Sequence, residues 1–142
     1  MIEPSTPPRC LVLVVAEDRT FAERCRRELE AAGHRASVAP GWWVGVHLAE
    51  LEKPDLVVVD EALADVDGLS VLALLKAHPS TAGLPVIVAA SRERPDLRRR
   101  AEQLGARAIA LKSELSVARL LGYLASGLFQ QPATASSVGP AS

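Results

Sequence analysis

Carboxylates and one lysine follow apolar runs at three separate points of the chain. Asp60 closes the run 56–59, Glu17 and Asp18 follow a second run, and Lys112 follows a third. Parallel strands end at one edge of a sheet, so we expect these charged side chains to converge there. Clustered carboxylates repel one another, and a divalent cation or a nearby lysine relieves the repulsion. The pattern predicts an acidic pocket, although Asp60 taken alone could instead cap the turn after its strand.

Strand and helix patterns alternate along the sequence. Apolar, β-branched runs indicate strands buried on both faces, and apolar residues at helical spacing separate them. We expect strands at 11–16, 35–39, 56–60, 85–90 and 107–111, and helices at 21–32, 43–51, 69–78, 97–104 and 115–128. This order predicts an α/β fold, a doubly wound five-stranded parallel sheet with five helices covering its two faces.

The composition fits a single domain. The 142 residues are 49% hydrophobic and 23% charged, and we expect the domain at 9–129, between a flexible tail at 1–8 and a disordered tail at 130–142. A net charge of -1 gives no reason to expect nucleic-acid or membrane partners. No signal peptide or membrane-spanning stretch is recognisable, so we expect a cytoplasmic protein. Cys10 and Cys25 lack metal-ligand spacing, which favours small buried hydrophobes.

These motifs together resemble a response-regulator receiver domain of two-component signalling, similar to a single-domain chemotaxis receiver. The resemblance covers roughly residues 9–128 and rests on Asp60, on Asp67-Gly68 and on Gly105-Ala106, which stands seven residues before Lys112. It implies the flavodoxin-like strand order 2-1-3-4-5. It also implies that Asp60 is the phosphoacceptor and that Lys112 is the lysine that the family places beside it.

The resemblance also implies a Mg²⁺ ion, in a site that this sequence weakens. The ligands would be Glu17, Asp60 and the backbone carbonyl of Ala62. Ala16 stands where the family has the first acid of its pair. A slip of the loop by one residue would instead present Glu17 with Asp18, and the sequence leaves both arrangements open.

The switch positions of the family are also altered. Ala90 stands where the family has Ser or Thr, with Ser91 next to it, and Ile109 replaces the aromatic residue of the fifth strand. In the family the hydroxyl hydrogen-bonds a phosphoryl oxygen while the ring turns inward. The substitutions predict a weakened relay unless Ser91 supplies the hydroxyl.

Three functional classes follow from this resemblance. The first is a receiver that accepts a phosphoryl group on Asp60 from a sensor histidine kinase or phosphotransfer protein. Phosphorylation would change the face made by the fourth helix, fifth strand and fifth helix, and this face would bind a downstream protein. The sequence also leaves a homodimer open. The alternative is a degenerate receiver, a phosphorylation-independent interaction module. An aspartyl phosphatase is disfavoured because Ala62 stands where that enzyme class needs a second Asp.

Two surface features have two interpretations each. Trp42-Trp43 is either a docking hot spot or a hydrophobic lid over the edge of the core, and adjacent helical residues cannot both face one core. We therefore expect one ring to be partly exposed. The arginines around the fourth helix favour either an acidic partner or a solvated face; they are Arg92, Arg94, Arg98, Arg99 and Arg100.

Overall fold

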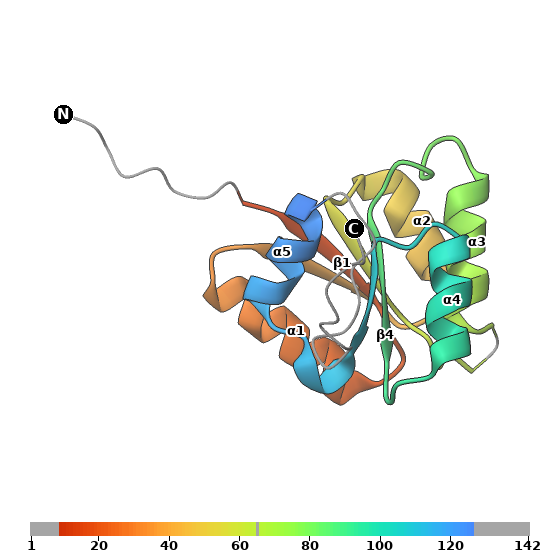
Figure 1. The fold of residues 1–142 in the computed structure, drawn as a ribbon. Helices are drawn as coiled ribbons and strands as arrows, with labels where there is room; N and C mark the ends of the chain where they lie inside the picture. The colour runs from red at the N-terminus through yellow and green to blue at the C-terminus, as the bar shows by residue number, and fades with distance from the viewer. Residues whose placement is uncertain (1–8, 65, 127–142) are drawn as a thin grey trace.

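Strands and helices alternate through the part of the chain that the structure, a computed structural model, describes: residues 9–64 and 66–126 (Figure 1). The elements are β1 (Leu11–Val15), α1 (Arg19–Ala31), β2 (Arg35–Ala39), α2 (Trp42–Glu52), β3 (Leu56–Asp60), α3 (Gly68–Ala77), β4 (Val86–Ala90), α4 (Pro95–Gln103), β5 (Ala108–Leu111), a 3₁₀ turn (Lys112–Glu114) and α5 (Val117–Ser126). The expected bounds agree to within a few residues, and the 3₁₀ turn was not expected.

The five strands form one parallel sheet in the order β2-β1-β3-β4-β5, which confirms the predicted fold. Asp60 of β3 pairs with Ala89 of β4, and the neighbouring Ala90 pairs with Leu111 of β5. Since Lys112 directly follows Leu111, this register brings the ends of β3, β4 and β5 to the same edge of the sheet. The same edge receives the end of β1, because Val15 pairs with Val59.

Helices cover both faces of the sheet. Figure 1 shows α1 and α5 on one side and α2, α3 and α4 on the other. All five residues of β3 are buried, with Val57 facing the core under α2–α4 and Val58 facing the core under α1 and α5. Full burial of a Val or Leu side chain contributes about 1.5–3 kcal/mol relative to exposure. This two-sided burial explains why the strands are apolar without alternation.

The remaining expectations concern the two ends of the chain, the cysteines and membrane-spanning helices. The tails expected at 1–8 and 130–142, and the last two residues of the helix expected to reach 128, lie outside the described residues. Cys25 is buried as expected, whereas Cys10 is only partly buried because it precedes β1. In 9–64 and 66–126, no helix is long and apolar enough to cross a membrane.

Candidate functional site

Asp60 ends β3 as a buried carboxylate, with 1% of the residue exposed. Its Oδ1 accepts a hydrogen bond from the backbone N–H of Ala62 at 2.9 Å. Its Oδ2 lies 2.7 Å from Lys112 Nζ, and this ion pair is the oxygen's one polar contact within the described residues. An isolated buried carboxylate would be costly, so the fold must keep the lysine close to it.

Lys112 bridges two carboxylates that come from different strands. Its Nζ lies 3.3 Å from Asp18 Oδ2 as well as 2.7 Å from Asp60 Oδ2, with 17% of its side chain exposed. Burial lowers the pKa of Lys112, but the hydrogen bonds and charges of Asp60 and Asp18 outweigh burial and leave the pKa above the ordinary 10.5. The lysine is therefore a fixed cation at neutral pH.

Asp18 has two roles in the structure. As the N-cap of α1, its Oδ1 accepts from the backbone N–H of Phe21 at 3.1 Å, while its Oδ2 faces Lys112. The Phe21 hydrogen bond is the largest cause that lowers the pKa of Asp18 below its ordinary 3.8, and Lys112 adds to the effect despite some desolvation. The start of α1 thus orients the carboxylate that holds the lysine.

Helix α1 also contacts Lys112 through Phe21 and Arg24. Lys112 Nζ lies 5.2 Å from the centroid of the buried Phe21 ring, and the Arg24 guanidinium carbon lies 5.6 Å from that centroid. Arg24 Nη2 also donates to the backbone carbonyl of Lys112. Cations within about 6 Å of an aromatic centroid are attracted to it. These contacts hold the residue after β5 against α1.

Glu17 lies at the same edge but contacts the loop after β3 instead of the lysine. Its Oε1 accepts from the backbone N–H of Ala64 at 2.8 Å. Ala16, the residue before it, is 3% exposed and packs in the apolar core under α1 and α5. After β1, Ala16 therefore packs in the core, Glu17 contacts the loop after β3, and Asp18 contacts Lys112.

Gly68, at the start of α3, packs directly against the backbone of the phosphoacceptor candidate. A Cβ atom at Gly68 would lie 2.5 Å from the carbonyl oxygen of Asp60 and 2.6 Å from Glu61 Cα. The Gly68 N–H donates to the Glu61 carbonyl at 3.0 Å. Asp67 caps α3, since its Oδ1 accepts from the Ser70 N–H at 2.8 Å. The Asp67-Gly68 pair thus holds the start of α3 against the backbone at the end of β3.

The altered switch positions lie in apolar surroundings. Ala90 and Ile109 are 1% and 4% exposed and share the core under α2–α4, whereas Ser91 is exposed. A cavity of about 10 Å³ is lined by both buried residues and by the start of α4, including Arg94. A space of this size is at the lower limit for holding one water molecule.

The acids do not form a cluster of metal-ligand type. Among the residues that the structure describes, no group of three or more His, Cys, Asp or Glu side chains could hold a metal ion. A groove of about 830 Å³ lies beside the pocket and is lined by Ala16, Glu17 and Arg19, together with residues of α1 and of the turn after β2. Asp60, which is 1% exposed, is not among the residues that line this groove.

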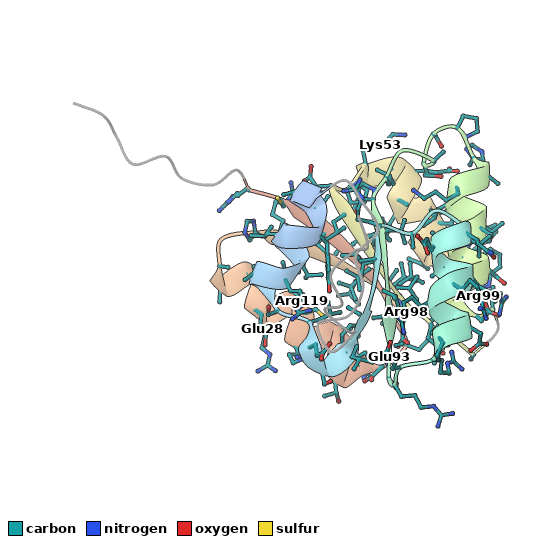
Figure 2. The ribbon with its side chains drawn as sticks, in the orientation of Figure 1. Glu28, Lys53, Glu93, Arg98, Arg99 and Arg119 are labelled. Carbon is teal, nitrogen blue, oxygen red and sulfur yellow. The ribbon has the colours of Figure 1, made fainter. Side chains whose placement is uncertain are left out.

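Several contacts of the site were not anticipated from the sequence. The sequence pointed to Lys112 as the one cation at this edge of the sheet. The structure places a second cation there, because Arg94 forms a 2.9 Å ion pair with Glu61, the residue after Asp60. Figure 2 shows Arg98 beside Glu93, with which it forms an ion pair, and Arg99 on the outer side of α4. The position of Asp18 just before α1 could have predicted its hydrogen bond to Phe21, because an N-cap side chain accepts from the first backbone N–H groups of its helix.

Comparisons with known proteins agree with this geometry. The model of the response regulator receiver domain family matches residues 12–124. Protein PilH of Pseudomonas aeruginosa is 29% identical over 82 residues, which are 58% of this chain and 68% of PilH. The gliding motility regulatory protein of Myxococcus xanthus is 38% identical over 108 residues, 75% of this chain. The chain spans only 14% of that longer protein.

Solved structures show the same fold. The signal receiver domain of a DNA-binding response regulator from Colwellia psychrerythraea superposes with a TM-score of 0.71 at 26% identity, covering 78% of this chain and 91% of that one. The chemotaxis response regulator CheY4 of Vibrio cholerae gives 0.74 at 16% identity, covering 85% and 100%. With a family match that includes both Asp60 and Lys112, the chain belongs to the response regulator receiver domain family.

Proposed function

We propose that this receiver accepts a phosphoryl group on Asp60. The observation that carries the proposal is the buried Asp60–Lys112 ion pair at the carboxyl edge of the sheet, with Oδ2 2.7 Å from Nζ. Such a pair supplies a nucleophile and a fixed positive charge in a site shielded from water. We place the functional unit at residues 9–129, and in this proposal it acts as a signalling module rather than as an enzyme.

The proposed step is an in-line displacement at phosphorus. A carboxylate oxygen of Asp60 forms the new P–O bond while the bond to the leaving group breaks, and the leaving histidine or carboxylate keeps the electron pair. Charge spreads over the equatorial phosphoryl oxygens. Lys112 neutralises part of it, and the Ala62 N–H can donate to an oxygen at the same place. Because Lys112 covers Asp60 Oδ2 in the structure, the ammonium must move from the carboxylate toward the incoming phosphoryl group.

We also propose a weak Mg²⁺ site in this pocket, although the described residues hold no cluster of three or more metal-ligating side chains. Receiver domains generally bind Mg²⁺ where they are phosphorylated, and Mg²⁺ is usually held by one or two carboxylates with several waters. Asp60, Glu17 and the backbone carbonyl of Ala62 are the donors that we propose, with Asp18 as a further acid at the edge. The ion would supply positive charge to the phosphoryl oxygens. The methyl group of Ala16 occupies the place of a stronger ligand, which supports weak binding.

The proposed partners follow from the same assignment. A sensor histidine kinase or a phosphotransfer protein would donate the phosphoryl group, and a downstream protein would bind the face formed by α4, β5 and α5. Helix α4 carries the exposed arginines Arg99 and Arg100 together with the exposed acids Asp96 and Glu102, and the arginines favour an acidic partner surface.

A second candidate function has its own observation in favour of it. Ala16 and Ala90 are both buried in apolar clusters, where the family has an oxygen ligand and a hydroxyl. A receiver without these oxygens could instead keep the fold and bind its partner without phosphorylation. In that case the Asp60–Lys112 pair would be a structural ion pair, and no phosphoryl donor would change the protein.

Incubation with acetyl phosphate and Mg²⁺, followed by intact mass measurement, separates the two functions. We expect the parent protein and Asp96→Asn to gain one phosphoryl group, and Asp60→Asn to gain none. Asp96 is an exposed acid on α4 and therefore controls for loss of any carboxylate. A parent protein that gains no mass at about millimolar donor would favour the phosphorylation-independent module, and a label that survives Asp60→Asn would refute the assignment.

A further inference from the structure

Arg94, at the start of α4, is tied to the residue that directly follows Asp60. Its Nη2 lies 2.9 Å from Glu61 Oε2, with 39% of the arginine side chain and 20% of the glutamate side chain exposed. The backbone N–H of Glu61 donates to the carbonyl of Ala89 at 2.9 Å, which holds Glu61 at the end of β3 beside β4. The ion pair therefore connects the start of α4 to the end of the strand that carries the proposed phosphorylation site.

Arg94 also borders the altered switch positions. It lines the small cavity beside Ala90 and Ile109, on the side of the pocket where Ala90 offers no side-chain hydrogen-bond donor. Arg98, one turn further along α4, forms its ion pair with Glu93 instead. Arg94 is therefore a cation that borders both this cavity and the end of β3.

Phosphorylation would change the charge balance around the Arg94–Glu61 pair. Lys112 already contacts the carboxylates of both Asp18 and Asp60, so it offsets only part of the charge at the strand ends. A phosphoryl group carries about two negative charges and three acceptor oxygens. Coulomb attraction to a dianion exceeds that to a carboxylate at the same distance, and a guanidinium can donate two hydrogen bonds to a phosphate at once. The phosphoryl group would therefore compete with Glu61 for Arg94.

We propose that Arg94 leaves Glu61 and binds a phosphoryl oxygen as the group is transferred to Asp60, in place of the hydroxyl that Ala90 lacks. This inference rests on the proposed function, since it needs a phosphoryl group at Asp60. Lys112 binds the phosphoryl group from the α1 side of the pocket and Arg94 binds it from the α4 side. In the unphosphorylated protein, Glu61 occupies Arg94 and so opposes the transfer.

The backbone of Arg94 gives this exchange a route to α4. Its carbonyl accepts from the Arg98 N–H at 3.1 Å, as the first hydrogen bond of the helix. As the N-cap of α4, Arg94 makes no side-chain cap hydrogen bond, so its guanidinium can move without breaking one. Movement of the Arg94 side chain acts on the residue from which α4 begins. We therefore expect α4 to respond to phosphorylation even though position 90 carries alanine.

Phosphorylation rates of the parent, Arg94→Gln, Glu61→Gln and the double variant test the exchange. Intact mass during incubation with acetyl phosphate and Mg²⁺ gives each rate. Arg94→Gln should be slower by about tenfold or more, the effect of losing a hydrogen bond to a charged group. Glu61→Gln should be faster, by up to about fivefold, because it frees Arg94 from a partly exposed ion pair. A purely structural pair would instead give changes of the same direction, since either substitution breaks it.

The double variant separates release of Arg94 from loss of a negative charge beside Asp60. Once Arg94 is glutamine, Glu61→Gln should add little, because no guanidinium remains to be freed. Arg99→Gln removes an exposed arginine from α4 and should keep the parent rate. A partly exposed ion pair contributes little to stability, so we expect all of these variants to fold, as urea unfolding would check.

A resonance of Arg94 itself provides the second measurement. Its Nε–Hε signal, assigned by its loss in Arg94→Gln, should shift when beryllofluoride and Mg²⁺ are added, whereas that of Arg99 should stay in place. A parent protein that gains no phosphoryl mass would refute the proposed function, and this inference with it. If the parent is labelled but Arg94→Gln is labelled equally fast, if Glu61→Gln accelerates labelling equally with and without Arg94, or if the Arg94 signal does not shift, the role of Arg94 alone is refuted.

Discussion

Lys112 is the residue on which the charge balance of the pocket depends. It lies 2.7 Å from a carboxylate oxygen of the buried Asp60 and 3.3 Å from one of the half-exposed Asp18. Interactions of this kind strengthen where water is excluded, so the Asp60 contact contributes more than the Asp18 contact. A single lysine therefore offsets one of the two carboxylate charges that it contacts, before any phosphoryl group or metal ion arrives.

Lys112→Ala should fold but lose stability. Breaking a buried pair by removing one partner leaves an uncompensated charge and costs about 3–5 kcal/mol, and we expect the lower end because part of the lysine is exposed. The free energy of unfolding in urea at neutral pH measures this loss. Added Mg²⁺ should stabilise the variant more than the parent, because the freed carboxylates attract the ion.

Arg99→Ala provides the control for this comparison, since it removes an exposed positive charge from α4. It should change neither the free energy of unfolding nor the response to Mg²⁺. An identical thermal response to Mg²⁺ in Lys112→Ala and the parent would contradict the assignment of Lys112 as the cation of the pocket.

Asp18 gives the site an acid-sensitive component. Because its pKa is lowered in the folded protein, the charged form stabilises the fold above its ordinary pKa of 3.8. That contribution is lost as the pH falls through the lower, folded pKa. Asp18→Asn keeps a capping side chain but cannot titrate. The stability difference between the parent protein and the Asp18→Asn variant should therefore shrink as the pH is lowered from about 5 toward about 3, as urea unfolding would measure.

At the scale of elements, the return of the chain from β3 to α3 determines where Asp60 lies. Gly68 approaches the Asp60 carbonyl so closely that a methyl group has no room there. Gly68→Ala should cost about 1–3 kcal/mol of unfolding free energy and should displace the end of β3. Gly122→Ala, in α5, has open space around the added methyl and should instead stabilise by about 0.5–1 kcal/mol.

Equal effects of these two glycine substitutions on unfolding would contradict the close packing at Gly68. The amide resonance of Ala62 offers a second measurement, because its N–H donates to Asp60 Oδ1. We expect it to shift in Gly68→Ala and to stay in place in Gly122→Ala.

The elements themselves were largely predictable from the sequence. The run before Asp60 is apolar because both faces of β3 are buried, and the pattern of such runs determines the number of strands. Helix ends were less accurate, since α1 begins at Arg19, ahead of the first apolar residue of its pattern. The 3₁₀ turn at Lys112 could not be predicted, because it depends on contacts of that residue with α1 that lie far away in the sequence.

The site was predictable only in its outline. Spacing placed Asp60 and Lys112 at one edge, as the structure also does, while the roles of the two residues stay a prediction. The separate directions of Glu17 and Asp18 depend on the N-cap of α1 and on the loop after β3. Those side-chain directions are set by local hydrogen bonds that no periodicity encodes.

At the scale of the molecule, a charge change at Asp60 must reach the face around α4. Ala90 cannot donate a hydrogen bond to a phosphoryl oxygen, and a small cavity lies beside it. Ala90→Thr should restore a donor that contacts the phosphoryl group only in the active state, which favours that state by about 1.5–3 kcal/mol. Amide shifts along α4 and at Ile109, measured with and without beryllofluoride, should become larger.

Ala90→Val is the matched control, because it has the shape of threonine without the hydroxyl. It should respond to beryllofluoride like the parent protein. If threonine and valine give the same shifts, the relay does not use a hydroxyl at position 90, and the exposed Ser91 becomes the residue to test.

The most direct test of the central claim is the location of the phosphoryl group. Reduction of an aspartyl phosphate with borohydride converts that residue to homoserine, which peptide mass spectrometry can assign to a position. After treatment with acetyl phosphate and Mg²⁺, we predict homoserine at position 60 in the parent protein, less of it in Lys112→Ala and none elsewhere in the chain. Homoserine at another aspartate, or an unchanged Asp60 in a protein that has gained phosphoryl mass, would contradict the account.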